Sequence, residues 1–190
     1  VEQVAPRVRR VIAENPSKYT YRGTGTYIVG EGDVAVIDPG PDLDSHRVAL
    51  EAALQGSRVV AICVTHCHID HSPLARWLAE RTGAPTFAFG PHREGCDTAP
   101  PELADDEHQE AVEWSFRPDL AVADGELVAR GGRGAAGWSL RAVHTPGHTP
   151  NHLCFALPEE SILFTGDHVM GWSTTVVSPP DGDMAAYVDS

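Results

Sequence analysis

The chain has 190 residues, enough for one domain with its own hydrophobic core, and we expect residues 1–190 to form a single domain. Hydrophobic residues make up 42% and charged residues 22%, a composition that excludes a disordered chain. The net charge of −13 argues against a broad surface for nucleic acid. Since the sequence has neither an apolar run of about 18 residues nor a signal-peptide pattern, we expect a cytoplasmic protein with no membrane partner.

Strands and helices alternate along the chain. The pattern predicts a strand or bent hairpin over 19–29, a strand over 34–37, a helix over 45–54 with Ser45 as its N-cap, a strand over 59–64, and a helix over 73–82 that begins near Pro73 and stops at Gly83. Shorter strands are expected at 86–89, 126–129, 139–143, 152–156 and 162–164, and a capped helix begins within 183–190. Buried strands flanked by helices favour a layered α/β domain, and short strands with turn signals fit two sheets packed face to face.

The least regular stretch is residues 90–118, which are polar, acidic and proline-bearing. An irregular segment of this length in a compact domain is usually a functional lid or a mobile loop. We expect this stretch and the loop around Trp172 to contribute to substrate specificity.

Four candidate metal ligands lie close together in the segment THCHIDHS, which follows the predicted strand 59–64. In extended backbone, His66 and His68 project to the same side, and Asp70 and His71 follow in the turn before the next helix. Imidazole nitrogens and carboxylate oxygens bind Zn²⁺ at about 2.0–2.2 Å, so the ligands must converge. Because the two pairs cannot reach one position without strain, the spacing favours two adjacent metal sites over one.

The segment HTPGHTPNH supplies another candidate ligand. Gly147 allows the backbone to turn tightly just before His148, and we expect His148 to bind metal. The two flanking histidines, His144 and His152, fit a structural or supporting role as well as a functional one.

The segment FTGDHV places Asp167 directly after a predicted strand. The two oxygens of a carboxylate can each bind one cation, so Asp167 can bridge two metal ions. A lone aspartate at a strand end more often caps a turn or a helix. The two histidine segments shift the preference toward the bridging role.

Taken together, TYIV, VIDPG, THCHIDH, HTPGHT and FTGDH occur in the order and at about the spacing of the metallo-β-lactamase superfamily, which the chain resembles from about residue 24 to residue 183. The resemblance implies a four-layer αββα sandwich with the metals at one edge between two sheets. It also implies His66, His68 and His148 as ligands of a first metal, Asp70 and His71 as ligands of a second, and Asp167 as the bridge. Asp38 in VIDPG resembles the acidic residue that supports a ligand from below, although it can equally be a plain turn residue.

The residue at the bridging position indicates which branches of the superfamily the chain resembles. Common class B lactamases carry a cysteine there, whereas Asp167 is similar to the glyoxalase II, thioesterase and ribonuclease branches. The stretch 165–184 closely resembles a β-lactamase-like subgroup that includes a mitochondrial endoribonuclease and bacterial hydrolases. The resemblance therefore argues against antibiotic hydrolysis.

One departure from the superfamily pattern concerns the second metal. The superfamily supplies this metal with a further histidine after the bridging aspartate, and no histidine follows His168 here. His168 adjoins Asp167 and is poorly placed to substitute. We therefore expect the domain to be truncated at its C-terminus, with the missing ligand beyond Ser190. A chain complete at Ser190 would have a weak second site.

These ligands predict a binuclear metallo-hydrolase with two Zn²⁺ ions per subunit. Histidine and aspartate also suit iron and manganese, so either metal is an alternative. Zn²⁺ lowers the pKa of bound water to about 7, which makes metal-bound hydroxide available as a nucleophile. We expect Asp70 and Asp167 to be the catalytic residues, and the sequence offers no dedicated general acid.

The preferred substrate is a small-molecule ester or thioester. One alternative is an endoribonuclease acting on single-stranded RNA, and another is a non-catalytic zinc-binding domain. The acidic charge counts against RNA, and Arg7, Arg9 and Arg10 form the one basic cluster in the sequence. Such a cluster is more often a solvated face than a binding site.

Overall fold

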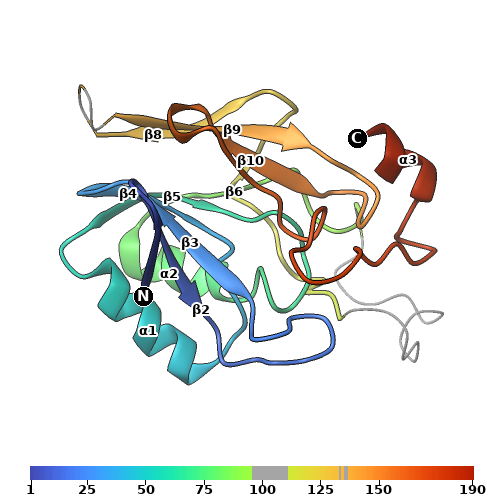
Figure 1. The fold of residues 1–190 in the computed structure, drawn as a ribbon, viewed down its shortest axis with the longest axis horizontal. Helices are drawn as coiled ribbons and strands as arrows, with labels where there is room; N and C mark the ends of the chain where they lie inside the picture. Colours follow the sequence, from blue (N-terminus) through green and yellow to red (C-terminus); the bar gives the residue numbers. More distant parts are fainter. Residues whose placement is uncertain (96–110, 133, 135–136) are drawn as a thin grey trace.

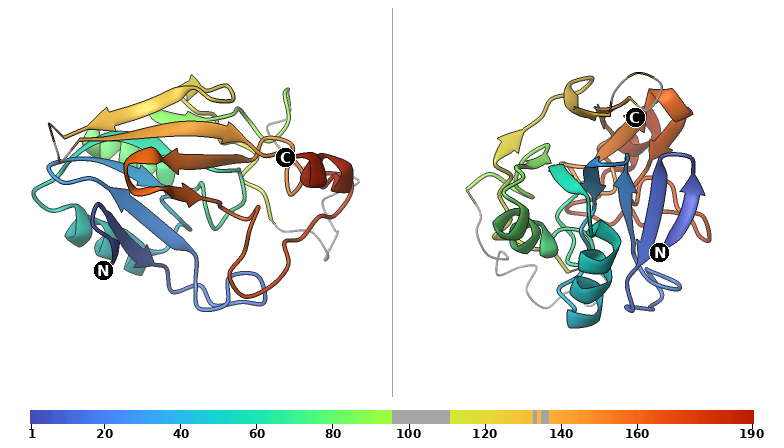
Figure 2. Two further views of the ribbon diagram at one scale, coloured as in Figure 1. Left: turned by 45° about the horizontal axis from the view of Figure 1, so that its top comes forward. Right: turned by 90° about the vertical axis from the view of Figure 1, so that its left-hand side faces the viewer.

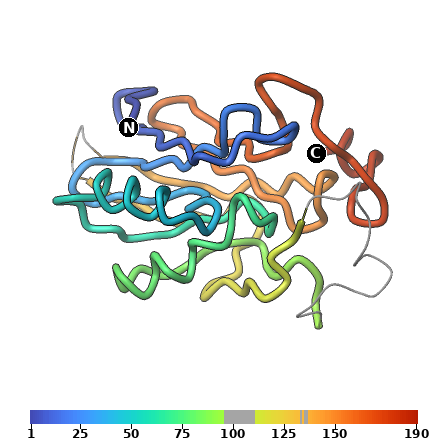
Figure 3. The backbone as a smooth tube through the Cα atoms, turned by 90° about the horizontal axis from the view of Figure 1, so that it is seen from below, coloured from blue at the N-terminus to red at the C-terminus, as the bar shows by residue number. Residues whose placement is uncertain are grey.

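Two β-sheets pack face to face, and two helices cover the outer face of the larger sheet (Figure 1). The structure is a computed structural model that describes residues 1–95, 111–132, 134 and 137–190. Figure 2 shows the same layers from two other directions, and Figure 3 shows both helices in front of the strands when the molecule is seen from below. The layered α/β fold class predicted from the sequence is confirmed.

Within the described residues, the larger sheet has seven strands, arranged in chain order. They are β1 (Glu2–Ala5), β2 (Val8–Ile12), β3 (Gly25–Val29), β4 (Asp33–Ile37), β5 (Arg58–Cys63), β6 (Thr86–Ala88) and β7 (Leu120–Ala121). The pairs from β1 to β4 are antiparallel, and those from β4 to β7 are parallel. Parallel neighbours need a long crossover, and α1 (Asp44–Leu54) provides it from β4 to β5 and α2 (Leu74–Thr82) from β5 to β6.

In the part of the chain that the structure describes, the smaller sheet has four antiparallel strands in the order β11, β10, β9, β8. Its strands are β8 (Leu127–Gly131), β9 (Trp138–His144), β10 (Leu153–Leu157) and β11 (Ile162–Phe164), and the short helix η2 (Pro158–Glu160) joins β10 to β11. The last helix, α3 (Met184–Asp189), lies at one end of the sandwich (Figure 1). The Asp183 side chain caps α3, as predicted, by accepting hydrogen bonds from the backbone N–H groups of Ala185 and Ala186.

The residues of β4 explain why a central strand is apolar on both faces. Val34 and Val36 pack in the core between the larger sheet and the helices, whereas Ala35 and Ile37 pack in the core between the two sheets. Successive side chains of a strand point to opposite faces, so a strand between two cores needs a continuous apolar run.

Most predicted elements agree with the structure to within a residue or two, but two predictions need correction and one hairpin was missed. Helix α1 begins at Asp44 after Leu43, so Ser45 lies inside the helix and is not its cap. Residues 19–24 form turns, and the predicted strand begins only at Gly25. The N-terminal hairpin of β1 and β2 was not predicted, because its arginines interrupt the apolar pattern.

The predicted irregular stretch 90–118 lies partly outside the described residues. Its flanks at 91–95 and 111–118 contain turns and bends and a single bridge, His68 to Val112. Among the described residues, no helix is long and apolar enough to cross a membrane.

Candidate metal centre

Three loops from both sheets converge at one edge of the sandwich. The THCHIDHS segment follows β5, the HTPGHT segment joins β9 to β10, and the loop carrying Asp167 follows β11. Each loop begins where a strand ends, so the polar side chains meet just beyond the buried apolar core. The sandwich itself therefore brings residues as distant as His68 and His148, 80 positions apart in the chain, into one site.

His66, His68 and His148 form what we call the three-histidine group. His68 Nδ1 lies 2.9 Å from His66 Nε2 and 3.1 Å from His148 Nε2, and all three side chains are buried. Ligand atoms of these residues and of Asp167 all lie within 4.8 Å of one another. Nitrogens bound tetrahedrally to Zn²⁺ lie about 3.3 Å apart, so this arrangement fits a divalent cation with little rearrangement.

Asp70, His71 and Asp167 form what we call the His71 group, beside the first. His71 Nε2 lies 3.2 Å from Asp70 Oδ2 and 3.4 Å from Asp167 Oδ1. The other oxygen of Asp167, Oδ2, lies 3.8 Å from His148 Nε2. One carboxylate thus faces both groups, which is the placement that a bridging ligand requires.

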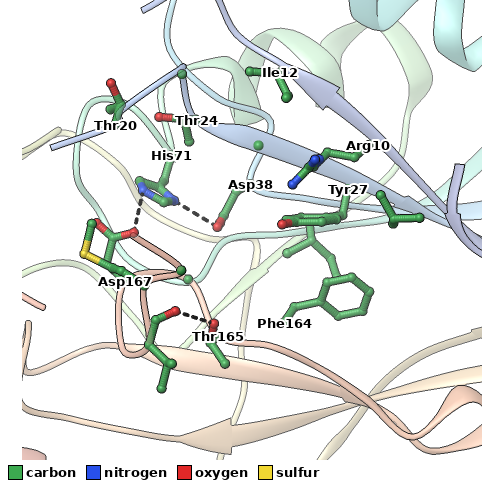
Figure 4. A pocket seen from close by; sticks show the side chains of 18 of the residues that line it. Arg10, Ile12, Thr20, Thr24, Tyr27, Asp38, His71, Phe164, Thr165 and Asp167 are labelled. Atoms are coloured by element: carbon green, nitrogen blue, oxygen red, sulfur yellow. Dashed lines mark hydrogen bonds and ion pairs between the residues drawn. The ribbon is translucent and has the colours of Figure 1, made fainter. Parts of the chain in front are cut away.

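Asp38 contacts residues of both groups, and Figure 4 shows its contact with His71. Its Oδ2 lies 2.9 Å from His71 Nδ1, and its two oxygens accept hydrogen bonds from the backbone N–H and the hydroxyl of Thr65. The Thr65 hydroxyl also lies 2.9 Å from His66 Nδ1. Asp38 therefore contacts one candidate ligand directly and reaches another through Thr65, a supporting role that the sequence left open.

Hydrogen bonds fix which imidazole nitrogen is available to a cation. The Val176 carbonyl accepts from His148 Nδ1, and Asp38 accepts from His71 Nδ1, so each histidine directs Nε2 toward the site. Since the Thr65 hydroxyl donates to Asp38, it accepts from His66 Nδ1, and His66 Nε2 faces the site in the same way.

The electrostatics of the two groups differ. Burial, together with neighbouring imidazoles, lowers the pKa of His66 well below its ordinary value, which favours the neutral form. Burial also lowers the pKa of His71, but the carboxylates of Asp70, Asp167 and Asp38 outweigh it and hold the pKa well above its ordinary value. Burial raises the pKa of Asp167, and the charge of His71 reverses the shift and lowers it.

The remaining histidines of these segments fall outside both groups. His152 is buried, and its Nε2 accepts a hydrogen bond from the backbone N–H of Asp167, so it positions the carboxylate. His144 stacks on Phe89 at 3.9 Å and is structural. The ring of His168 packs against Tyr187 at 4.7 Å, as expected for a residue unsuited to replace a ligand.

Sequence reasoning missed two residues that hold the Asp70 and Asp167 side chains in place. The Thr24 hydroxyl donates to Asp70 Oδ2 at 2.7 Å, and no local signal predicts a contact across 46 positions. Gly166 has a φ of +48°, and a Cβ there would lie 2.7 Å from His152 Nε2 and 2.8 Å from Thr65 Oγ1. The glycine just before Asp167 was a readable signal for this close approach.

A cluster of charged residues that sequence reasoning also missed links the segment before α3 to the loop after β6. Asp181 lies 3.1 Å from Nε2 of the buried His92 and accepts hydrogen bonds from Arg93. Burial raises the pKa of Asp181, but its contacts with His92 and Arg93 lower it overall. The cluster borders the site, because the rings of His92 and His68 lie 6.4 Å apart.

Comparisons with known proteins agree with this geometry. The family model of the metallo-beta-lactamase superfamily matches residues 21–190. An atrochrysone carboxyl ACP thioesterase of Paecilomyces divaricatus is 34% identical over 191 residues, covering 99% of this chain and 51% of the relative. The chain spans about half the length of the curated relatives it matches.

Two solved structures show the same fold. A metallo-beta-lactamase family protein from Thermus thermophilus is 26% identical with a TM-score of 0.70, covering 98% of this chain and 68% of that protein. Another protein, solved in a di-iron-bound form, is 26% identical with a TM-score of 0.67, covering 95% of this chain and 82% of that protein.

Proposed function

Because the chain belongs to the metallo-β-lactamase superfamily, and because its histidines and carboxylates form two adjacent groups, we propose that it is a metal-dependent hydrolase of thioesters. The reaction joins the oxygen of water to the carbonyl carbon, breaks the carbon–sulfur bond, and transfers a proton to the departing thiolate.

The observation that carries the proposal is the position of Asp167. One of its oxygens lies 3.4 Å from His71 and the other 3.8 Å from His148, so a single carboxylate faces both groups. A purely structural aspartate at a strand end would bond to backbone N–H groups of a cap. Two cations held side by side suit hydrolysis, in which both the attacking and the leaving atoms need stabilisation.

Each residue has a distinct role in this proposal. His66, His68 and His148 hold one cation, Asp70 and His71 hold a second, and Asp167 contacts both. A bound cation pair supplies an activated water and a positive charge for the substrate carbonyl oxygen. Asp70 and Asp167 orient the attacking water by accepting its hydrogen bonds, and Asp38 and His152 keep the ligands in place.

Zinc is the metal we propose, because three imidazoles and one carboxylate suit Zn²⁺ at the observed spacing. Iron is the alternative, since His and Asp ligands also suit iron and one structural relative was solved with two iron ions.

A thioester is preferred over RNA for two reasons. A curated relative bears the name of an ACP thioesterase. The arginines of the one basic cluster are also engaged within the protein: Arg7 pairs with Glu160, Arg9 donates to the Ala53 carbonyl, and Arg10 pairs with Glu2. They therefore do not form the open basic patch that single-stranded RNA needs.

The test is a substrate panel with the purified protein loaded with Zn²⁺, Fe²⁺ or Mn²⁺. We expect hydrolysis of an N-acetylcysteamine thioester that a chelator abolishes and added metal restores, with no cleavage of fluorescent single-stranded RNA. Cleavage of RNA without thioester turnover would refute the proposal. Tight binding of one metal with no hydrolysis of either substrate would instead support a non-catalytic zinc-binding domain.

A further inference from the structure

The turn after β4, residues 38–40, which we call the Asp38 turn, has an unusual backbone conformation. Asp38 has a φ of +50°, in the left-handed region, and Gly40 follows with a φ of +94°. A residue with a Cβ adopts the left-handed conformation at a cost in free energy, so surrounding contacts must hold it there. The contacts that hold Asp38 therefore also determine where its carboxylate lies.

Two hydrogen bonds tie the backbone of Asp38 to the neighbouring strands. Its N–H donates to the Cys63 carbonyl on β5 at 2.8 Å, and its carbonyl accepts from the Thr26 hydroxyl on β3 at 2.6 Å. Since β4 lies between β3 and β5 in the sheet, the two bonds hold Asp38 from both sides. Thr26 is fully buried, so water has no access to replace its hydroxyl.

The Thr26 hydroxyl has a second buried partner, His46 on α1. His46 Nε2 lies 2.9 Å from Thr26 Oγ1, and the histidine is 1% exposed. A hydroxyl has one hydrogen, and Thr26 gives it to the Asp38 carbonyl, so Thr26 accepts from the N–H at His46 Nε2. Burial lowers the pKa of His46 despite an opposing contact with the Pro39 backbone, which favours a neutral ring with its proton on Nε2.

His46 also lies against the far end of the Asp38 turn. A Cβ on Gly40 would lie 2.6 Å from His46 Nε2 and 3.2 Å from Thr26 Oγ1, so only glycine lets the ring approach. The N–H of Gly40 donates to the His71 carbonyl at 3.0 Å, and Asp38 Oδ2 lies 2.9 Å from His71 Nδ1 (Figure 4). The turn thus contacts both the backbone and the side chain of His71.

Packing alone does not account for a histidine at this position of α1. The helix buries His46, Leu50 and Ala53 along one face, at the spacing of a helix that packs on a sheet. An apolar side chain would fill the first position at lower cost, because burying an imidazole removes its polar atoms from water. The hydrogen bond to Thr26 offsets that cost, and it links the helix to the Asp38 turn.

We propose that His46 and Thr26 are positioning residues for the His71 group. Their hydrogen bonds hold the Asp38 turn, and the turn orients His71 so that its Nε2 faces the carboxylates of the group. The inference rests on the proposed function, because this positioning matters to hydrolysis only where the His71 group holds the second cation. It adds two residues from α1 and β3, elements outside the three loops that carry the candidate ligands.

Thr26→Val tests the proposal with little change in shape, and Thr26→Ser keeps the hydroxyl. The matched control is Thr86→Val. Thr86 is 4% exposed on β6 of the same sheet, and its hydroxyl likewise donates one hydrogen bond, to Asp119 Oδ2, and accepts another, from the Asp119 N–H. Both valine variants should therefore lower the melting temperature, but only the first removes a contact to the Asp38 turn.

His46 is tested by a second pair of variants. His46→Leu removes the N–H and keeps an apolar side chain on the buried face of α1. His46→Gln can place an amide N–H near the position of Nε2, so it should restore part of what His46→Leu loses. Rescue by an amide distinguishes the hydrogen bond to Thr26 from the packing of the ring.

The first measurement is amide hydrogen exchange in the metal-free proteins. The N–H groups of Asp38 and Gly40 both donate within the protein, so their exchange reports opening of the turn. We expect exchange at both to rise by about fivefold or more in Thr26→Val and His46→Leu, as expected for one lost buried hydrogen bond. Thr26→Ser and Thr86→Val should exchange at these positions like the unaltered protein.

The second measurement is stepwise titration with Zn²⁺. In Thr26→Val and His46→Leu the affinity of the His71 group should fall by about tenfold, and that of the three-histidine group by about twofold or less. Thr26→Ser and Thr86→Val should keep both affinities, even though Thr86→Val melts at a lower temperature.

The outcomes separate this inference from the proposed function. Equal losses of affinity in Thr26→Val and Thr86→Val, or unchanged exchange at Asp38 and Gly40, would overturn the inference while thioester hydrolysis stands. If the unaltered protein binds no second cation and hydrolyses no thioester, the proposed function fails. Faster exchange in Thr26→Val and His46→Leu, but not in Thr86→Val, would then still support the hold of these two residues on the Asp38 turn.

Discussion

In the three-histidine group, burial and neighbouring imidazoles lower the pKa of His66, whereas in the His71 group three carboxylates raise the pKa of His71. In the first group His66 therefore favours the neutral form, and hydrogen bonds to Nδ1 of His66 and of His148 direct Nε2 of each ring toward the site. The second group balances its negative charge with a proton on His71. The two adjacent groups thus differ in whether a binding cation must displace a proton.

This difference in pKa predicts the order in which the two groups bind metal ions. A cation entering the three-histidine group meets in His66 a ligand that already favours the neutral form, so it displaces no proton from that residue. A cation entering the His71 group must replace the proton that neutralises Asp70 and Asp167. We therefore expect the three-histidine group to bind first, and the His71 group to bind more weakly and with more dependence on pH.

The largest effect should come from removing the central ligand of the three-histidine group. His68 lies 2.9 Å from His66 and 3.1 Å from His148, so His68→Ala leaves both neighbours without their shared partner. We expect tightly bound metal to be lost and thioester hydrolysis to fall by more than the ~100-fold that supporting residues usually control. Metal analysis by mass spectrometry and steady-state kinetics measure both quantities.

The control for that variant is His144→Ala, because His144 stacks on Phe89 outside both groups. It should keep its metal and its activity. If His68→Ala retained full metal content, the assignment of the three-histidine group as the first site would be wrong.

A smaller effect is expected from Asp38→Asn, which removes the charge beneath both groups. Asparagine tolerates the positive φ of 50° at this position, so the turn should survive. The direct contact is to His71, and the contact to His66 passes through Thr65, so the His71 group should lose more. We expect its metal affinity to fall by about 10–100-fold, measured by competition with a chelating dye. An equal loss at both groups would show that Asp38 does not distinguish them.

The pH dependence of metal affinity should also differ between the two groups. The pKa of His71 is raised, so His71 is protonated over a wider pH range than a free histidine, and bound metal requires it to be neutral. Below that pKa the affinity of the His71 group should fall by up to about tenfold for each unit of decreasing pH. Calorimetry in buffers of different ionisation enthalpy should detect one proton released by the second cation and fewer by the first. Equal proton release in both steps would contradict the comparison.

The sequence predicted the candidate ligands better than it predicted what supports them. His66, His68, Asp70 and His71 lie in one short segment, and the spacing of ligand types along a strand and a turn is readable without a structure. In the structure His66 lies 2.9 Å from His68, and Asp70 lies 3.2 Å from His71. Metal occupancy and the roles of these residues remain predictions that the experiments above test.

The supporting contacts could not be predicted because they cross long stretches of chain. Thr24 reaches Asp70 across 46 positions, and Asp181 reaches Arg93 across 88. Threonine and aspartate occur in turns and caps throughout the sequence, so neither residue carries a signal of its own. The N-terminal hairpin was missed for a related reason: its arginines interrupt the apolar pattern, and the hydrogen bonds that engage them appear only in the fold.

The smallest effects on metal binding are expected from substituting two threonines, one that contacts His66 and one that contacts Asp70. Thr65 is fully buried and lies between Asp38 and His66, whereas Thr24 donates to Asp70, whose side chain is 23% exposed. Thr65→Val leaves the His66 N–H without an acceptor and without access to water, a loss of about 1–3 kcal/mol. Thr24→Val leaves a carboxylate that water can still reach, so the loss should be about 0.5–1.5 kcal/mol.

Each variant serves as the control for the other, because the substitution is the same and the candidate ligand that the threonine contacts differs. Thr65→Val should weaken metal binding by the three-histidine group more than by the His71 group, where Asp38 loses one donor but keeps the backbone N–H of Thr65 and its contact with His71. Thr24→Val should weaken binding by the His71 group alone, and to a smaller extent. Stepwise metal titration followed by calorimetry separates the two affinities. If both variants weakened the same binding step, the two groups would be acting as one site, and the contrast in charge between His66 and His71 would not govern how metal enters.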